Sequence, residues 1–302
     1  EYRRSLGEWL SVWWDGIRPA YLPLSIMPVV VGSALAWTQS IAAKSLLGHF
    51  HVLRFLATLI AVILLQIGAH LVNDYYDYLK GIDTSNSLGP GGLIQQGLIQ
   101  PARVLSFGLI LLAFGALVGV LVAGSGGLLV FVFGLVGLLC AYFYSATSRA
   151  LSSLALGELV SFLIFGPFIT LGAYMVQTGH IDRFVLLYSI PLGLLATAVI
   201  HLNNMRDTES DLQARKHTLA SLWGLRMDRA FYVVLLLGVY ATIIALALPR
   251  HAPHLVLLTL WTLPTAIIAV TDVLRTDAPA GLHLAMRQTL KVETYFTLWL
   301  VV

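Results

Sequence analysis

Two acidic stretches, each at the end of a long apolar run, contain the residues best suited to chemistry. In the first stretch, five polar residues share or adjoin one helical face: Gln66, His70, Asn73, Asp74 and Asp77. Four of them are spaced by four, three and four residues, which on a helix makes one stripe. Carboxylates at the end of a span-like apolar run are costly unless they bind something. The stripe is therefore a candidate ligand site.

The second stretch repeats this arrangement further along the chain. Asn203, Asp207 and Asp211 are four residues apart and so share one helical face, and Asn204 stands beside them. Four carboxylates that meet at one membrane face need a cationic partner. Hard carboxylate and amide oxygens suit Mg²⁺, which commonly shares its coordination shell with substrate phosphates.

Basic residues close to both stretches could neutralise phosphate oxygens: Lys80, Arg206, Arg215 and Lys216. Two acidic helix ends bridged through Mg²⁺ to one diphosphate would stabilise that diphosphate as it departs. The apolar helices behind them would accept a long hydrocarbon chain. The residues alone therefore favour an enzyme that ionises an isoprenyl diphosphate.

The composition indicates a polytopic membrane protein. Of the 302 residues, 58% are hydrophobic and 11% are charged, whereas soluble domains carry about 25% charged residues. Residues 104 to 148 contain no acidic, basic or histidine side chain. Since a helix crosses the hydrocarbon in about 20 residues, this stretch predicts two spans with a turn at 124–127. We expect the bilayer, and no nucleic acid, as the macromolecular surroundings.

The same reading along the chain predicts an all-α membrane protein of one domain, residues 1–302. Residues 1–17 read as an interfacial helix with tryptophans at headgroup level. Nine transmembrane helices are expected to form a bundle around a central cavity that opens near the cytoplasmic side. The nine spans fall at 19–43, 53–78, two within 104–148, 158–180, 183–201, 229–250, 254–272 and 284–302.

The distribution of basic residues predicts the orientation. If the N-terminus is cytoplasmic, only four of the 18 Lys and Arg residues lie in outside segments: Lys44, Arg54, Arg183 and Arg250. This bias follows the positive-inside rule. It places the N-terminus and both acidic stretches on the cytoplasmic side, and we expect a multi-pass protein of the plasma (inner) membrane.

The motifs resemble those of a known family. Asn73-Asp74-x-x-Asp77-x-x-Lys80-Gly81-x-Asp83 is similar to the first signature of the UbiA superfamily of intramembrane prenyltransferases. The second signature is similar to Asn204-x-x-Asp207-x-x-x-Asp211, followed by Lys216-x-Thr218-Leu219-Ala220.

Four further segments resemble the MenA branch of this superfamily, the 1,4-dihydroxy-2-naphthoate polyprenyltransferases. They are Leu88-Gly89-Pro90-Gly91-Gly92, Leu156-Gly157-Glu158, Phe165-Gly166-Pro167 and Gly172-x-Tyr174-x-x-Gln177-Thr178-Gly179. The 4-hydroxybenzoate branch would have a third Asp at position 81, where this chain has glycine.

This resemblance implies a Mg²⁺-dependent transfer of a polyprenyl group from its diphosphate to dihydroxynaphthoate, with loss of CO₂, in menaquinone biosynthesis. The catalytic residues implied are Asp74, Asp77, Asp207 and Asp211. The implied metal site adds Asn73 and Asp83 to these four. The residues implied for substrate binding are Asn73, Lys80, Tyr144, Arg149, Asn204, Arg206 and Lys216.

Plainer interpretations stand beside these. The carboxylates could be solvated helix ends or structural ion pairs, and Asp83 could be plain loop surface. His70 and His201 are more often packing residues than ligands, and Glu158 could serve as a helix N-terminal charge. The Gly-rich loop at 89–92 could be a turn or a lid over the site.

Other functions also remain open at this stage. Relatives use other acceptors, such as 4-hydroxybenzoate or homogentisate, or a phytyl donor that leads to phylloquinone. An ion-coupled transporter is the alternative from another class, and it would hold carboxylates near the bilayer midplane beside broken helices.

Overall fold

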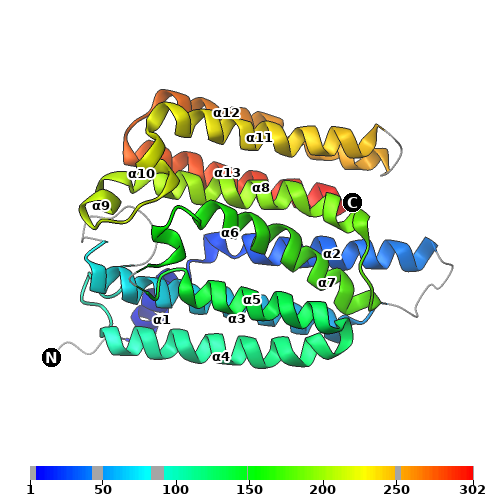
Figure 1. Ribbon diagram of the computed structural model, residues 1–302, viewed down its shortest axis with the longest axis horizontal. Coiled ribbons are helices and arrows are strands. Elements are labelled where there is room, and N and C mark those ends of the chain that lie inside the picture. The colour runs from blue at the N-terminus through cyan, green and yellow to red at the C-terminus, as the bar shows by residue number, and fades with distance from the viewer. Residues whose placement is uncertain (1–4, 43–49, 83–91, 148, 249–252, 302) are drawn as a thin grey trace.

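The computed structural model describes residues 5–42, 50–82, 92–147, 149–248 and 253–301, which fold into long helices lying side by side (Figure 1). The first half of the bundle contains α2 (Pro23–Ala42), α3 (Val52–Lys80), α4 (Pro101–Gly126) and α5 (Leu128–Phe143). The second half contains α8 (Arg183–Arg206), α11 (Leu225–Ala247), α12 (Leu263–Arg275) and α13 (Pro279–Val301). Shorter elements connect them: η1 (Pro19–Tyr21), η2 (Leu151–Ser153), α9 (Thr208–Gln213), α10 (Leu219–Trp223) and the 3₁₀-helix η4 (His254–Thr262).

One continuous helical rod, residues 157–178, lies between the two halves along the chain, and its helical geometry changes along its length. α6 (Gly157–Leu163) passes into a single π-helical turn, η3 (Ile164–Phe168), and then into α7 (Ile169–Thr178). Pro167 lies in the π turn. A proline has no N–H to donate and its ring clashes with a regular α-helix, so the wider turn is where the chain can accommodate it.

Within the described residues, six helices are long and apolar enough to cross a membrane, which makes the chain a multi-pass membrane protein. A seventh is counted if the pair 7–21 and 23–39, bent by 51°, is one span. α5 has 16 residues and is shorter than a full span, and α13, which carries Arg287, Lys291 and Glu293, is not among the six. The division of 104–148 into two helices is confirmed, whereas the count of nine stays a prediction.

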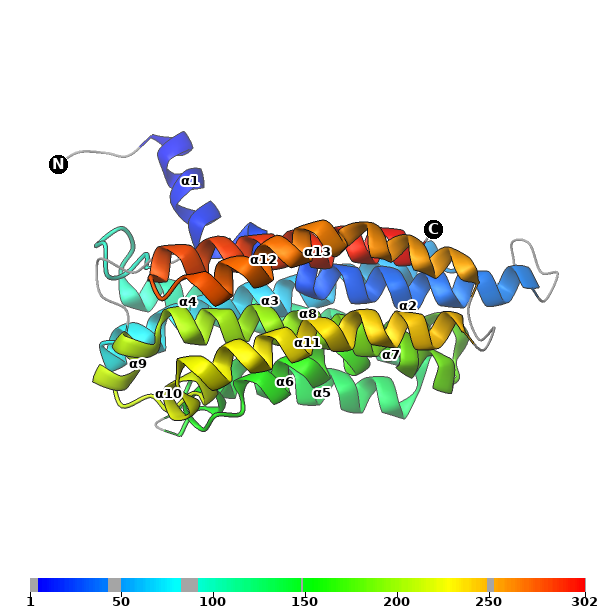
Figure 2. The same cartoon turned by 90° about the horizontal axis from the view of Figure 1, so that it is seen from above.

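α1 (Leu6–Ile17) projects from one end of the bundle (Figure 2). It begins with a capping box, in which the Glu8 amide donates to the Ser5 hydroxyl and the Ser5 amide donates to the Glu8 carboxylate. Trp9 and Trp13 pack against the core of α3 and α4, while Leu10 and Trp14 are exposed. The helix expected within residues 1–17 is therefore present, and its position at the membrane surface stays a prediction.

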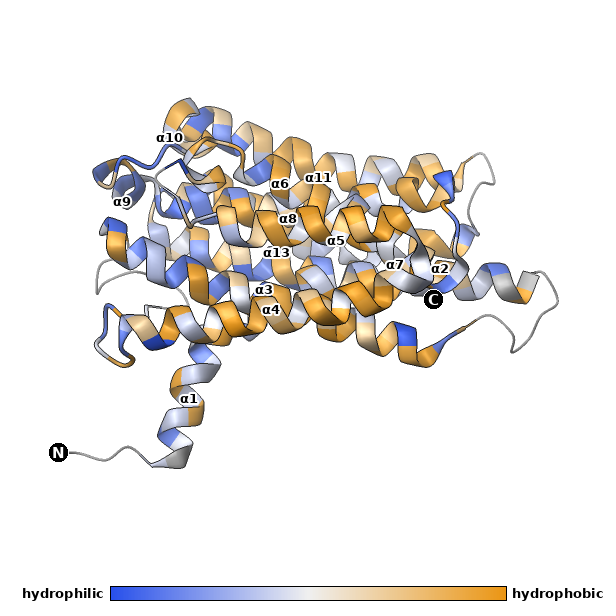
Figure 3. Ribbon diagram, turned by 60° about the horizontal axis from the view of Figure 1, so that its bottom comes forward, coloured by the Kyte–Doolittle hydropathy of each residue, from blue (hydrophilic) through white to orange (hydrophobic). Residues whose placement is uncertain are grey.

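Apolar residues cover the sides of the helices, and polar residues gather at the end that holds α9 and α10 (Figure 3). A bilayer offers no hydrogen bonds to the backbone, so helices that satisfy their own backbone groups are the form an apolar span must take. The interior is packed with large side chains that are fully buried, including Leu192 and Leu195 of α8, Tyr232 of α11 and Phe296 of α13.

Close helix contacts depend on small residues, and the tightest one joins α2 to α7. A Cβ atom added at Gly32 would lie 2.2 Å from the backbone oxygen of Thr170. Lipid tails are as apolar as the helix surfaces, so helices in a membrane associate through close packing. Small residues at such positions let their backbones approach closely. This contact fixes α2 against the rod that carries the π turn.

We therefore expect Gly32→Ala to force α2 and α7 apart and to destabilise the protein by about 1–3 kcal/mol, the usual range for overpacking. Thermal unfolding of purified protein in detergent would show this as a Tm lowered by several degrees. Gly124→Ala in α4 is the matched control, because a Cβ there meets nothing within 4 Å. Equal Tm values for the two variants would contradict the packing argument.

Candidate active site

A cavity of about 310 Å³ lies inside the bundle and brings the two acidic stretches together. Its polar end is lined by residues of both stretches: Asn73, Asp77, Asn203, Asn204, Arg206, Asp207, Asp211 and Lys216. Its remaining wall is mostly apolar and belongs to α3, α4, α5 and the α6–α7 rod. Gln66 and His70 also face it, so the predicted stripe on α3 does lie along one cavity wall.

The carboxylate of Asp77 is held at the end of α3. Its Oδ2 accepts a hydrogen bond from Asn73 Nδ2 at 2.7 Å, and the same amide nitrogen lies 2.7 Å from the Ser145 hydroxyl oxygen. Lys80 Nζ donates to the backbone oxygen of Ser145 at 2.7 Å. These contacts tie α3 to the segment that follows α5.

α3 ends because Gly81 adopts a left-handed conformation, with φ of 65°. Glycine reaches this region without the steric cost that other residues incur. The Gly81 amide donates to the backbone oxygen of Tyr78, and that of Ile82 to Asp77. The glycine that departs from the 4-hydroxybenzoate pattern thus has a structural reason to be there.

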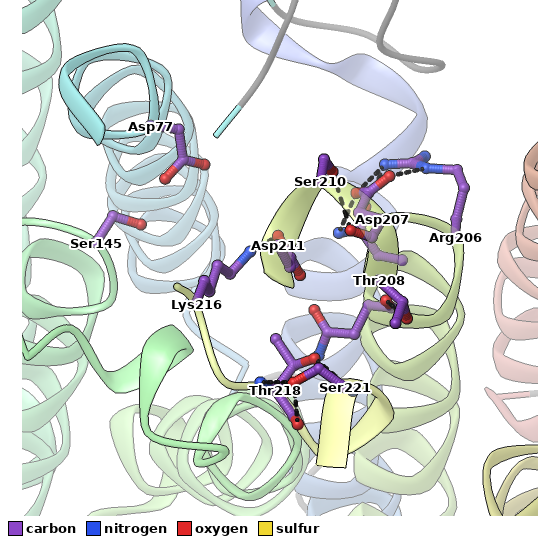
Figure 4. Close-up of polar contacts among 12 residues, drawn as sticks. Asp77, Ser145, Arg206, Asp207, Thr208, Ser210, Asp211, Lys216, Thr218 and Ser221 are labelled. Carbon is purple, nitrogen blue, oxygen red and sulfur yellow. Dashed lines mark hydrogen bonds and ion pairs between the residues drawn. The ribbon is translucent and has the colours of Figure 1, made fainter. Parts of the chain in front are cut away.

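Asp207 stands at the junction of α8 and α9. Arg206 donates two hydrogen bonds of 2.6 Å to its carboxylate, from Nε to Oδ1 and from Nη2 to Oδ2. Asn203 Nδ2 donates to Oδ2 at 3.2 Å. In Figure 4 this Arg206–Asp207 pair lies on the opposite side of Asp211 from Asp77.

Asp211 is fully buried and forms an ion pair with Lys216, whose Nζ lies 3.0 Å from Oδ1. Its other oxygen, Oδ2, has no hydrogen-bond partner among the described residues. Burial raises the pKa of the Asp211 carboxyl to about 6, although Lys216 acts in the opposite direction. Burial alone would lower the pKa of Lys216, but the negative fields of Asp211, Asp77 and Tyr144 together outweigh it and the pKa is raised. The pair is therefore charged at pH 7.

Asp74 has a different environment from the other three carboxylates. It is buried, forms an ion pair with Arg18, and is not part of the cavity wall. The next residue along an α-helix is turned by about 100°, so Asp74 points to another side of α3 than Asn73 does. Its predicted role as a metal ligand stays a prediction.

The residues of the polar end fit a Mg²⁺ ion that shares its ligands with a diphosphate. Among the described residues, no group of three or more acidic, His or Cys side chains is close enough to hold a metal by itself. Mg²⁺ often binds through one or two carboxylates with substrate phosphates and water. The buried Asp211 Oδ2 is an oxygen that such an ion would satisfy. Asp83 and residues 88–91 lie outside the described residues.

The other predicted substrate-binding residues fall into two groups. Tyr144, Asn204, Arg206 and Lys216 line the cavity. Lys80 and the exposed Arg149 are not in its wall. Ser145, which contacts both Asn73 and Lys80, was not predicted, because a single serine in a loop gives no signal in the sequence.

A second polar network lies behind the cavity wall and joins three helices. His201 of α8 has its Nδ1 3.1 Å from Glu158 Oε1 and its Nε2 3.2 Å from the backbone oxygen of Asp228. Asn204 Nδ2 donates to the same Glu158 oxygen at 2.9 Å. His201 thus packs inside the protein and does not line the cavity.

Three comparisons with known proteins describe what this chain is similar to. The profile of the UbiA prenyltransferase family matches residues 25–292. The 1,4-dihydroxy-2-naphthoate octaprenyltransferase of Bacillus subtilis is 29% identical over 294 residues, which cover 97% of this chain and 91% of the relative. The protein of the same name from Haemophilus influenzae is 33% identical over 241 residues, covering 78% and 76%. The solved structure of an Archaeoglobus fulgidus UbiA homolog bound to GPP and Mg²⁺ matches at 14% identity with a TM-score of 0.63, covering 96% of this chain and 100% of that one.

The geometry around Asp211 generates a pH prediction. Because its pKa is raised to about 6, the carboxyl should take up a proton as pH falls through about 6, where an exposed Asp would stay ionised. Infrared difference spectra of EDTA-treated protein would follow this titration, with Asp211→Asn identifying the band. Replacing Lys216 by Met removes the nearby cation and should move the midpoint higher. A midpoint near 4 in the unchanged protein would contradict this environment.

Proposed function

The chain belongs to the UbiA prenyltransferase family, as its motifs predicted, and from this premise we propose that it prenylates 1,4-dihydroxy-2-naphthoate. It would transfer a polyprenyl group from a polyprenyl diphosphate, release diphosphate and CO₂, and form demethylmenaquinol, the reduced form of demethylmenaquinone, for menaquinone biosynthesis. The observation that carries this proposal is a single cavity with carboxylates and a lysine at one end and an apolar wall beyond them.

The polar end has the groups that a diphosphate requires. Asp77, Asp207 and Asp211, with the amide oxygens of Asn73 and Asn204, would hold Mg²⁺, which would supply positive charge to a departing diphosphate. Among the described residues, the cations that line the cavity are Arg18, Arg206 and Lys216, and each is already positioned by a carboxylate. They would bind phosphate oxygens without a large rearrangement.

The apolar part of the cavity suits a long prenyl chain. Along α3 the lining residues run from Asp77 back to Thr58, which corresponds to about 28 Å of helix axis. On the facing side the wall includes Phe133 and Phe168, whose rings stack with centroids 4.8 Å apart. Such a wall would keep water away from the reactive allylic carbon, whose cation water would otherwise capture.

The proposed reaction is balanced without any added oxidant or base. The bond between the allylic carbon and the diphosphate oxygen breaks, and diphosphate leaves with the electron pair. The ring carbon that bears the carboxylate attacks the allylic carbon, and a new carbon–carbon bond forms. The carboxylate then leaves as CO₂, and the electrons of its bond restore the aromatic ring.

Two considerations support this acceptor over the alternatives of the same superfamily. The two relatives compared above are named for dihydroxynaphthoate, and both are similar over most of the chain. The Gly81 cap also replaces the aspartate that the 4-hydroxybenzoate pattern carries. Membership of a prenyltransferase family makes an ion-coupled transporter the weaker candidate. We further propose that the polar end of the cavity faces the cytoplasm in the plasma (inner) membrane, as the distribution of basic residues predicts.

The carboxylates generate a direct test of the mechanism. Asp77→Ala and Asp207→Ala should each lower prenyl transfer by at least about 100-fold, because each removes an anionic ligand from the diphosphate end. EDTA should abolish activity in the unchanged protein, and added Mg²⁺ should restore it. Asp277→Ala is the control, since this exposed carboxylate contacts Arg229 away from the cavity. Activity that survives in the first two variants or under chelation would refute the mechanism.

The acceptor can be tested separately in isolated membranes. With a polyprenyl diphosphate and carboxyl-labelled dihydroxynaphthoate, we expect demethylmenaquinol, detected by mass spectrometry as demethylmenaquinone after oxidation in air, and one labelled CO₂ per product. The same membranes should give little product with 4-hydroxybenzoate or homogentisate. Faster transfer to either of those acceptors, or a product that retains the carboxyl label, would disprove the assignment while leaving prenyl transfer intact.

A further inference from the structure

The first turn of α6 lies directly behind the polar end of the cavity. Glu158 is buried, and its backbone oxygen accepts a hydrogen bond from Thr197 of α8. Its side-chain Oε1 faces two donors of α8, namely Asn204 Nδ2 at 2.9 Å and His201 Nδ1 at 3.1 Å. Glu158 does not line the cavity, whereas Asn204 does. Of the three side chains that hydrogen-bond Glu158 in the described part of the chain, Asn204 is the one that lines the cavity.

His201 fixes Glu158 from the opposite side. Its Nε2 faces the backbone oxygen of Asp228, which can only accept, so Nε2 carries a hydrogen. Its Nδ1 lies 3.1 Å from Glu158 Oε1. Asp228 Oδ1 lies 3.7 Å from Nε2. Both nitrogens of this fully buried ring are thus engaged, and the ring holds the Glu158 carboxyl in place between α6 and α11.

The contact with Glu158 decides which way the Asn204 amide points. Glu158 Oε1 accepts this hydrogen bond, so the amide turns its NH₂ group toward Glu158. The amide oxygen is then directed away from Glu158, and within the described residues no donor forms a hydrogen bond to it. Since Asn204 is part of the cavity wall, this oxygen is available to a ligand in the cavity.

Gly157, the residue before Glu158, leaves room for the Tyr144 hydroxyl. A Cβ at position 157 would lie 2.9 Å from the Tyr144 hydroxyl oxygen and 3.9 Å from Asn204 Nδ2. Tyr144 also lines the cavity. The absence of a side chain at Gly157 therefore lets the hydroxyl approach α6 beside the amide of Asn204.

We propose that Glu158 is a positioning residue that orients Asn204, so that the amide oxygen faces the cation and diphosphate in the cavity. This inference rests on the proposed function, in that a divalent cation with a diphosphate is taken as the occupant. Glu158 itself does not contact the substrate. The His201 ring acts with it, since it restrains the carboxyl that Asn204 contacts.

Glu158→Gln separates this role from simple packing. Glutamine keeps the size of the side chain but can also donate a hydrogen bond, so the Asn204 amide can rotate and turn its NH₂ group toward the cavity. A donor group repels a cation. We therefore expect the divalent-ion concentration needed for half-saturation to rise about tenfold. This is the lower end of the usual range for removing a residue that orients a metal ligand.

The test measures ion binding and turnover in the full-length protein. Mn²⁺ binding in the presence of methylenediphosphonate, followed by electron paramagnetic resonance, should weaken about tenfold in Glu158→Gln. The Mg²⁺ concentration for half-maximal prenyl transfer should rise by the same factor, with kcat recovering at high Mg²⁺. Asp228→Asn is the matched control, because the backbone oxygen that contacts His201 remains; its Mn²⁺ affinity should equal that of the unchanged protein.

A double-mutant cycle completes the test. Asn204→Ala should weaken Mn²⁺ binding as Glu158→Gln does, and the double variant should be no worse than Asn204→Ala alone, because both changes act through one oxygen. Unchanged Mn²⁺ affinity in Asn204→Ala would overturn the proposal even if Glu158→Gln failed to fold. Additive losses, or a lower kcat and Tm in Glu158→Gln with unchanged ion affinity, would also overturn it.

The two readouts distinguish this inference from the proposed function. If the unchanged protein binds Mn²⁺ with methylenediphosphonate but transfers no prenyl group, the proposed function fails and the Mn²⁺ data still decide the role of Glu158. If the unchanged protein does not bind Mn²⁺ under these conditions, the inference fails together with its premise.

Discussion

The cost of placing charge inside an apolar helical bundle is the constraint on which the rest of this structure depends. Four acidic side chains in or beside the site have a cation or an imidazole in contact: Asp74 with Arg18, Asp207 with Arg206, Asp211 with Lys216 and Glu158 with His201. Removing one partner of such a pair leaves an uncompensated charge, which is strongly destabilising. The Arg18–Asp74 and His201–Glu158 pairs join separate helices and therefore favour the observed packing, because alternative arrangements would leave these charges unpaired.

The two residues of a pair are close together in the sequence in some pairs and far apart in others. The site therefore has a part that forms locally and a part that depends on helix packing. Asp211 and Lys216 are five residues apart, and the Lys216 amide also donates to the backbone oxygen of Asp211 at 2.7 Å. The second acidic stretch can thus form its own geometry locally. The contact between Arg18 and Asp74 spans 56 residues and depends on α1 and α3 having packed. One part of the site can therefore form from residues close together in the chain, whereas the other part forms only after the helices have packed.

This difference also explains what the sequence could and could not predict. Helical spacing correctly placed the Gln66-to-Asp77 stripe on one cavity wall, and the uncharged stretch correctly divided into α4 and α5. Periodicity identifies a face but not the residue opposite it, so neither the Arg18–Asp74 pair nor the contacts of Ser145 were foreseen. The Glu158–His201 network was missed for the same reason, because its members are 43 residues apart. The span count stays open because α5 is short and α13 carries charges at helical positions.

The π turn at Ile164–Phe168 bears on how this architecture can vary over evolutionary time. A π turn contains one residue more than the α-helical turn it replaces. Since each residue of a helix adds about 100° of rotation, that extra residue sets the angular phase of α6 independently of α7. The polar face of α6 carries Glu158, and the small-residue face of α7 packs on α2. These two faces lie on either side of the π turn, so the orientation of each about the helix axis is set separately. A lineage that lost one residue here would keep the outer packing of α7 and rotate the whole face of α6 away from the cavity.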